Sequence, residues 1–322
     1  MEFLKKAKDK NFWAGVREKE CFKKHREELL SIWEKHCTSP REALTYSDFK
    51  LYWTTGNRNI YEGKYFSRRL AISAASLLAL IYPEEEKYIN RLMDEIYVIC
   101  DEYTWCVPAH QKVLDPNNNS KIDLFASETA FALSEILEML GDRLDPLIKN
   151  RVDAEIERRI FSSFLAVDKY DWWEYGKTNW TAVCIGSIAG AFMLRRPEIA
   201  QELLPRFQKS MASYLSGFGD DGICLEGTNY WNYGFGFFVT YADMLKTFTE
   251  GELDWFKDKK VKSIASFIQK MAISENSSIS FSDATSNLRY HLGLCHYLKS
   301  IYSDDISLCN IKYSYNYDSC GR

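Results

Sequence analysis

The chain has 322 residues, of which 46% are hydrophobic and 27% are charged. This is the composition of an ordinary globular protein and excludes a disordered or fibrous chain. The formal net charge of −4 provides no overall basic field, and no basic stripe or recognition motif is present. We therefore expect no nucleic-acid partner.

The amino terminus, Met1–Lys10, is charged and lacks the apolar segment of a signal peptide. The best apolar run, Leu70–Ile81, is too short to span a bilayer. These features favour a cytoplasmic protein without a membrane partner. The nine cysteines show no CxxC pair and no cluster with histidine, so we expect reduced thiols, no metal site and no cofactor.

Apolar residues recur at three- and four-residue steps along most of the chain, which is the period of an amphipathic helix. Strand-like alternation is limited to Ser278–Phe281 and the tail Ser307–Tyr317. The fold class is therefore all-α, with about ten helices in successive antiparallel hairpins. No fixed repeat of the solenoid kind is present, which leaves an α/α toroid or an irregular bundle. The predicted helices are Glu18–His36, Arg68–Ile81, Glu84–Tyr103, Leu124–Leu140, Pro146–Leu165, Thr181–Leu194, Pro197–Leu215, Tyr230–Phe248, Val261–Ile273 and Leu288–Tyr302.

Four polar or aromatic segments interrupt this helical pattern. They are Tyr103–Asp123, Asp168–Asn179, Gly217–Tyr233 and Ser278–His291. In a stack of helical hairpins, alternate connections emerge on one face, where binding and catalytic residues are commonly placed. Candidate functional residues are therefore sought in these segments.

The first candidate block is DWWEYGKTNWTAVC, residues 171–184. Thr178 is expected to cap the following helix, which places Asn179 in its first turn. A side-chain amide at the positive end of a helix can donate to a carboxylate, as can the exposed backbone N–H groups. The alternative is a structural asparagine with neighbouring tryptophans packed in the core.

The second candidate block is DDGICLEGTNYWNYG, residues 220–234. Tyr230 and Tyr233 are three residues apart, so both hydroxyls can leave one face of a helix. A tyrosine acts as a base only if a cationic neighbour or a hydrogen-bond donor lowers its pKa. The alternative is a pair of amphipathic core tyrosines with satisfied hydroxyls.

The third block joins TWCVPAH, residues 104–110, to IDLFASETA, residues 122–130. His110 could neutralise an acidic group or tune a tyrosine. Alone it is a weak signal, and Glu128 in the second half is as compatible with a structural role as with a functional one.

These blocks occur in an order that resembles the heparinase II/III family of polysaccharide lyases and its alginate-lyase relatives, over roughly residues 50 to 300. The resemblance implies an α/α toroid over residues 1–305. Residues 306–322 would then form a tail at the start of a β-sandwich that is absent or truncated. It also implies β-elimination on an acidic oligosaccharide or polysaccharide that contains uronic acid. Without a signal peptide, short oligosaccharides are the expected substrates.

The resemblance also assigns roles to individual residues. Asn179 matches the group that neutralises the uronate carboxylate. The catalytic tyrosine matches Tyr230 or Tyr233, and Tyr230 is favoured because it follows the Glu-Gly pair closely. The remaining candidates are substrate-binding residues: His110, Trp173, Trp180, Glu226 and Trp231.

Two alternative functions stay open from the sequence. A glycoside hydrolase would use a pair of carboxylates, either Asp221 with Glu226 or Glu174 with Asp283. A non-catalytic carbohydrate-binding domain would use the same aromatic residues without turnover.

Overall fold

The computed structural model describes residues 4–112, 118–274, 277–284, 286, 291–303 and 305–307. The chain folds as two compact units, Glu2–Asp168 and Lys169–Asn316. We call them the amino-terminal unit and the carboxy-terminal unit, and each is described by itself. The division falls at Asp168, within the range that the sequence analysis treats as one domain.

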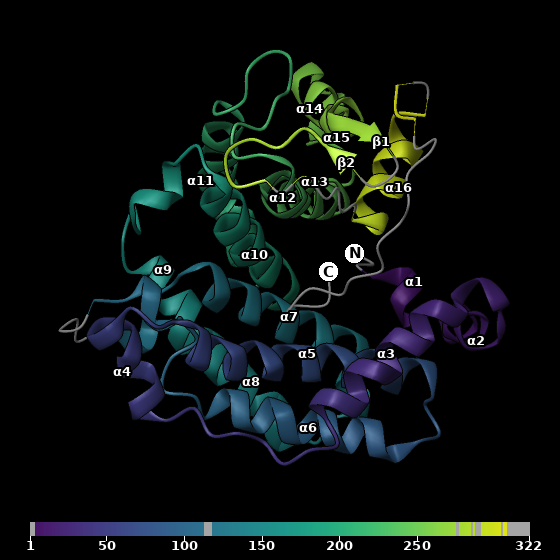
Figure 1. Cartoon of the computed structure of the whole chain (residues 1–322), viewed down its shortest axis with the longest axis vertical. Helices are drawn as coiled ribbons and strands as arrows, with labels where there is room; N and C mark the ends of the chain where they lie inside the picture. The colour runs from purple at the N-terminus through teal and green to yellow at the C-terminus, as the bar shows by residue number, and fades with distance from the viewer. Residues whose placement is uncertain are drawn as a thin grey trace. The chain divides into compact units, whose positions relative to one another are not determined.

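The amino-terminal unit is built around the long helix α5 (Figure 1). Helix α5 packs against α3 and α6, and α6 packs against α8. Gly56, with φ +75°, ends α4 in the left-handed conformation that glycine adopts without a steric penalty. The elements are α1 (Lys5–Lys8), α2 (Lys10–Glu18), η1 (Glu20–Phe22), α3 (Lys23–His36), α4 (Tyr46–Thr55), α5 (Asn59–Ile81), α6 (Glu86–Cys100), η2 (Pro108–His110), η3 (Asn118–Ser120), α7 (Leu124–Leu140), η4 (Gly141–Arg143), α8 (Pro146–Ile156), the π-helix η5 (Glu157–Phe161) and α9 (Ser162–Leu165).

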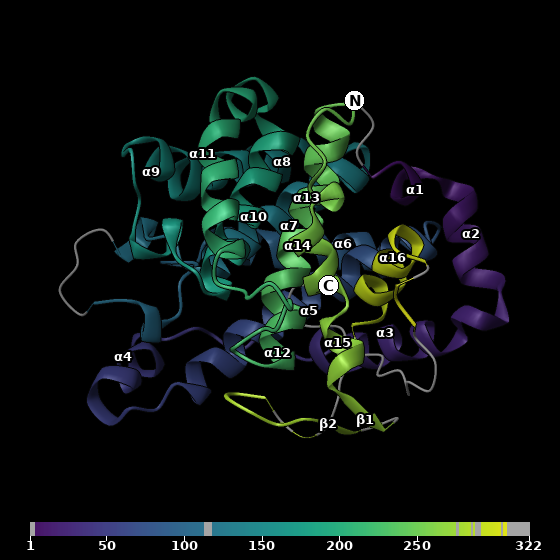
Figure 2. The same ribbon diagram turned by 90° about the horizontal axis from the view of Figure 1, so that it is seen from above.

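The carboxy-terminal unit is built around α10, which packs against α11 and α13 (Figure 2). Gly186 permits this packing, because a Cβ there would lie 3.0 Å from the Phe237 carbonyl oxygen. The elements are η6 (Trp172–Tyr175), α10 (Asn179–Arg195), α11 (Pro197–Leu215), α12 (Thr228–Tyr230), the π-helix η7 (Trp231–Phe235), α13 (Gly236–Phe248), η8 (Trp255–Lys257), α14 (Lys259–Ala265), α15 (Phe267–Met271), β1 (Ala272–Ser274), β2 (Ser277–Ser278) and α16 (Leu292–Ile301). Strands β1 and β2 pair antiparallel.

The all-α prediction is confirmed, since the described residues are mostly helical and contain one small sheet. The predicted bounds of α7 and α11 agree with the structure. Helix α4 was not predicted, and the helix expected from Glu18 begins instead at Lys23. The arrangement of the helices as a toroid stays a prediction.

Sequence patterns were less informative at the ends of the carboxy-terminal helices. The helix expected over Val261–Ile273 breaks at Ser266 and ends before β1. Most of the candidate strand Ser307–Tyr317 lies outside the described residues. In the described part of the chain, no helix has both the length and the apolar character needed to cross a membrane.

Candidate functional site

The amino end of α10 is capped by a carboxylate from a distant part of the chain. Thr178 occupies the N-cap position as expected, but its side chain makes no capping hydrogen bond. Instead, the backbone N–H of Asn179 donates to Oε2 of Glu226 at 3.0 Å. A carboxylate is favourable at this end of a helix because the unpaired N–H groups carry partial positive charge. Thr178 occupies the predicted N-cap position, but the capping hydrogen bond is accepted by Glu226 and not by the Thr178 hydroxyl. Binding of a substrate carboxylate at Asn179 stays a prediction.

The carboxyl pKa of Glu226 is raised in this position. Burial raises the pKa of the Glu226 carboxyl, the hydrogen bond from Asn179 opposes that rise, and the negative charge of Asp283 adds to it. Asp283 itself is exposed. Glu226 is therefore protonated more readily than an exposed glutamate.

The side-chain amide of Asn179 is the most distinctive polar group of the carboxy-terminal unit. The residue is only 3% exposed, yet no side chain or backbone group among the described residues forms a hydrogen bond with the amide. Buried amides are usually satisfied within the protein. The amide atoms are not among the fully buried unpaired side-chain atoms of the described residues, so the small exposed part of Asn179 lies at its amide, where a ligand can reach it.

Gly234 brings the tyrosine segment against Asn179. A Cβ at Gly234 would lie 2.9 Å from Cβ and 3.0 Å from Cα of Asn179, which is closer than carbon atoms normally approach. Only glycine permits this contact between η7 and the start of α10. Two blocks that are about fifty residues apart in sequence therefore meet in one unit, as the sequence analysis required of a common site.

The two candidate tyrosines flank the start of a π-helix. Tyr230 ends α12, and Tyr233 lies within η7; both side chains are partly exposed. The expectation that both hydroxyls leave one face assumed a regular α-helix, and the wider π turn does not have that spacing. Short π segments inside helices are frequent at functional sites.

His291 is a residue that the sequence analysis did not single out. Its backbone N–H donates to Oδ1 of Asn232, which lies between the two tyrosines, at 3.4 Å. Its Nδ1 accepts from the Leu294 N–H at 3.3 Å, so a neutral ring carries its proton on Nε2. Only its place at the end of the polar segment Ser278–His291 could have indicated it from sequence.

The four tryptophans of the first and second blocks divide into core and surface. Trp173 and Trp231 are 1% and 0% exposed, and the Trp231 indole N–H donates to the Ile264 carbonyl at 2.8 Å. Neither ring has a free face for a sugar in this structure. Trp180 is half-buried and lies 5.3 Å from Trp172, which is 55% exposed. The accessible aromatic pair beside Asn179 is therefore Trp172 and Trp180.

The four carboxylates considered for a hydrolase differ in their surroundings. Glu174 is fully buried and accepts two hydrogen bonds from Arg206, at 2.6 and 2.9 Å. Asp221 accepts from the Ile223 N–H within a turn. The carboxylate that influences Glu226 is Asp283, a combination that the sequence analysis did not consider.

His110 belongs to the amino-terminal unit. Its Nδ1 lies 2.7 Å from a carboxylate oxygen of Asp123, and its ring stacks on Phe125 at 5.4 Å. Asp123 also caps α7 by accepting from the Ala126 N–H. Glu128, on the same helix, is buried. His110 is thus held by structural contacts, and a role in substrate binding stays a prediction.

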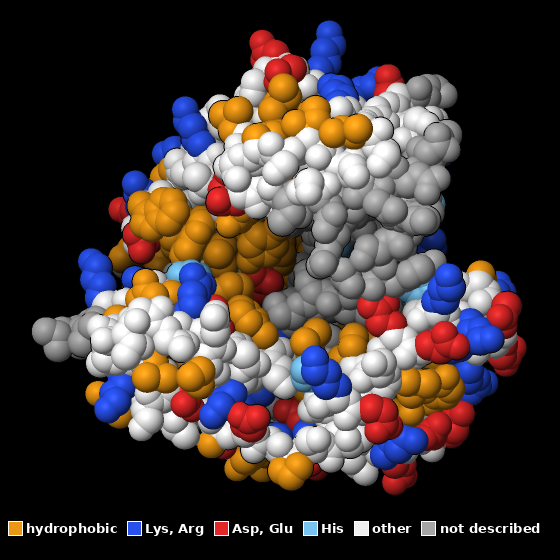
Figure 3. Space-filling view, viewed as in Figure 1, with side chains coloured by type: hydrophobic (Ala, Val, Ile, Leu, Met, Phe, Trp, Pro, Cys, Tyr) orange, Lys and Arg blue, Asp and Glu red, His pale blue; other side chains and the backbone are white. Residues whose placement is uncertain are grey.

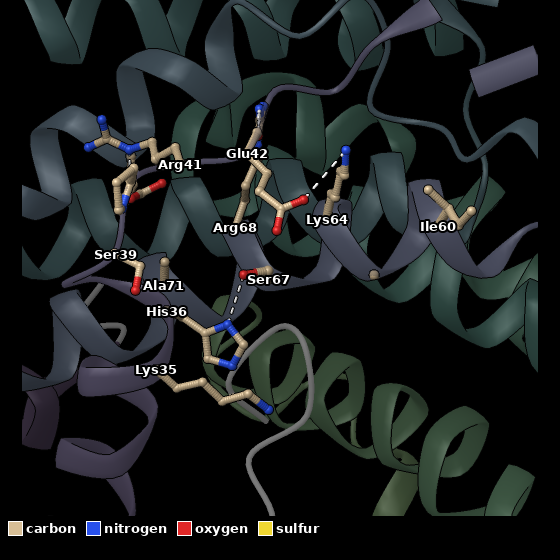
Figure 4. A pocket seen from close by; sticks show the side chains of 13 residues that line it. Lys35, His36, Ser39, Arg41, Glu42, Ile60, Lys64, Ser67, Arg68 and Ala71 are labelled. Atoms are coloured by element: carbon tan, nitrogen blue, oxygen red, sulfur yellow. Dashed lines mark hydrogen bonds and ion pairs between the residues drawn. The ribbon is translucent and has the colours of Figure 1, made fainter. Parts of the chain in front are cut away.

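Charges in the amino-terminal unit are balanced locally. Figure 3 shows basic and acidic side chains interspersed on the face of this unit that is in view, without a continuous basic surface there. A cavity of about 560 Å³ contains several basic side chains from α3, α5 and the intervening loop (Figure 4). Three of these are paired with carboxylates: Arg41 with Glu95, Lys64 with Asp48 and Arg68 with Glu102. The cavity is therefore a weak candidate for an anion site.

Among the residues that the structure describes, no group of three or more histidine, cysteine, aspartate or glutamate side chains could hold a metal ion. The cysteines within the same ranges are free thiols, and all except Cys21 are buried.

Comparison with known proteins does not place the chain in a family. No protein-family model matches the chain, and a search of curated proteins finds no relative. The resemblance to the heparinase II/III family therefore stays a prediction that rests on the sequence blocks.

Proposed function

We propose that the protein is a lyase that cleaves uronic-acid-containing oligosaccharides by β-elimination at Asn179 and the Tyr230–Tyr233 turn. The observation that carries the proposal is the close approach of Gly234 to Asn179. It joins an unsatisfied amide to a segment with two partly exposed phenols. The helices would form the α/α toroid that the family resemblance implies.

The proposed reaction needs a donor for negative charge and a group that transfers a proton. Removal of the proton on C5 of the uronate places charge on its carboxylate, and the Asn179 amide would donate to that carboxylate. The electron pair then forms the C4–C5 double bond as the C4–O4 bond breaks, and the leaving oxygen takes up a proton. A single positioned donor can stabilise such charge by roughly 3–4 kcal/mol.

One of the two tyrosines would transfer the proton. A phenol is a weak acid, so it needs a donor or cation nearby before it acts as a base. The backbone N–H of His291 donates to the side chain of Asn232, between the two tyrosines, and His291 is the histidine that we propose for this task. The Nε2–H of neutral His291 would donate to the phenolate of Tyr230 or Tyr233 and so stabilise it.

The charge state of Glu226 would affect the binding of an acidic substrate. An ionised Glu226 beside Asn179 would repel a uronate carboxylate, whereas its neutral form would not. Because the pKa of Glu226 is raised, the neutral form persists to a higher pH than for an exposed glutamate. We therefore propose that acidic substrates bind better as the pH is lowered toward the glutamate range.

The test is to incubate the purified chain with oligomers of alginate, polygalacturonate, hyaluronan and heparan sulfate. The unsaturated product absorbs ultraviolet light, so elimination is followed directly. Asn179→Ala and either Tyr230→Phe or Tyr233→Phe should each lower the rate at least about a hundredfold. The matched controls Asn229→Ala and Tyr97→Phe should retain it. Saturated products alone would exclude elimination.

A hydrolase is the second candidate, favoured by the raised pKa of Glu226 and its interaction with Asp283. Glu226 would protonate the leaving oxygen, and Asp283 would activate water or attack the sugar. In that case Asp283→Asn abolishes turnover, Asn179→Ala has little effect, and the products are saturated.

A further inference from the structure

The amino-terminal unit contains a second cavity, of about 620 Å³, whose wall includes residues of α4 and α5 and the segment that follows α6. Its volume is within the range of cavities that bind small molecules. Five of the twelve residues that line it are aromatic: Tyr46, Phe49, Trp53, Tyr61 and Tyr103. None of these residues belongs to the site around Asn179.

The aromatic wall is preformed. Phe49 meets three rings nearly edge-on, those of Trp53 at 5.1 Å, Tyr61 at 5.2 Å and Tyr103 at 6.3 Å. Tyr61 is buried in a core cluster with Tyr65 and Val107, so the floor of the cavity is fixed by the core. Tyr46 and Tyr103 at the rim are 75% and 63% exposed. A ligand therefore meets ring faces that are already in place, without reorganising the fold.

The polar groups of the cavity carry balanced charge. Arg68 donates to Oε1 of Glu102 at 3.1 Å, and Asp101 accepts from Arg151 at 2.7 Å. A charged ligand would have to break one of these pairs. The electrostatics therefore favour a neutral ligand.

Two buried polar atoms of the cavity wall lack partners among the described residues. They are Oε2 of Glu102, an acceptor, and Nε of Arg68, a donor. A hydroxyl group both donates and accepts, so adjacent hydroxyls of one ligand can satisfy both atoms. Buried polar atoms without partners are unfavourable, and a small side-chain shift toward a ligand would relieve this cost.

We propose that this cavity binds a neutral pyranose unit of a glycan. The apolar C–H face of the sugar stacks on Trp53 and Tyr103, and its hydroxyls bond to Glu102 and Arg68. The amino-terminal unit is thus a glycan-binding module in its own right. The proposal does not rest on the elimination reaction, since it uses no residue of the carboxy-terminal unit.

Calorimetry and saturation-transfer NMR with the full chain test this binding. The probes are cellotriose, xylotriose, maltotriose and N-acetylchitotriose, with indole as a purely aromatic ligand. At least one trisaccharide should bind, and Tyr103→Ala and Trp53→Ala should each weaken it about tenfold, the loss expected for one stacking contact. Tyr97→Ala is the matched control, because Tyr97 is an exposed aromatic residue of α6 that does not line the cavity.

Three results would overturn the proposal. They are binding of none of the four trisaccharides at millimolar concentration, equal binding by wild type and both cavity variants, and binding of indole alone. Tyr103 is exposed, so its variant is expected to fold, and circular dichroism checks this. Asn179→Ala should keep full trisaccharide affinity whether or not the chain is a lyase. A loss of that affinity would also refute a separate module.

Discussion

Replacing Gly234 by alanine tests the contact on which the proposed site depends. The added methyl group would lie 2.9 Å from Cβ and 3.0 Å from Cα of Asn179, so η7 and α10 must move apart. Forced overpacking of this kind costs about 1–3 kcal/mol. The higher helix propensity of alanine offsets up to about 1 kcal/mol of that.

Gly236→Ala is the matched control, two residues further along the same helical segment. A Cβ at Gly236 meets only Cδ2 of Leu294, at an ordinary 3.6 Å. Gly236→Ala therefore has the higher helix propensity of alanine without the overpacking. The two variants should differ by about 1–3 kcal/mol in their free energies of unfolding. Denaturant titration of both variants measures this difference.

The same pair of variants reports on function. If Asn179 and the tyrosine segment act together, a shift of about 1 Å should lower the elimination rate about a hundredfold in Gly234→Ala. Gly236→Ala should keep the wild-type rate. Equal stability of the two variants would refute the argument that only glycine fits against Asn179.

Three further predictions concern individual charged residues. Burial raises the pKa of Glu226, so its contribution to stability is complete below the ordinary glutamate range and is lost as the pH rises through the folded-state pKa. Glu226→Gln should therefore become more stable relative to wild type between acidic and neutral pH. Unfolding titrations at several pH values measure this difference. Arg206→Met should cost about 3–5 kcal/mol, because it leaves the carboxylate of Glu174 buried and unpaired, and the double variant with Glu174→Leu should recover much of that loss in thermal unfolding. Asp258→Ala should cost about 1 kcal/mol, since its side chain accepts from the N–H groups of Lys260 and Val261 at the start of α14; an unchanged denaturation midpoint would contradict this.

Parts of the candidate site could be predicted from sequence because they depend on local chemistry. The residues before Asn179 indicated a helix start, and α10 does begin there. The capping group could not be predicted, because Glu226 is 47 residues away and no local pattern links the two. The hydroxyl of Thr178 was expected to cap the helix, and the half-buried carboxylate of Glu226 caps it instead.

The exposure of the tryptophan rings also could not be predicted from the sequence. Trp172 and Trp173 are adjacent and chemically identical, yet one is 55% exposed and the other 1%. Sequence indicates that such a residue suits a stacking site, but the exposure of each ring is decided by the elements that pack around it. The same holds for Trp231, which the sequence made a candidate for a sugar contact and whose ring lies in the core.

The sequence by itself determined the helical class and the bounds of several helices, because the spacing of apolar residues reflects which face of each helix is buried. It also indicated the segments that interrupt the helices. Only the tertiary structure decided which of those segments meet, through the contact of Gly234 with Asn179. The reason is that periodicity shows that a face is covered but not what covers it.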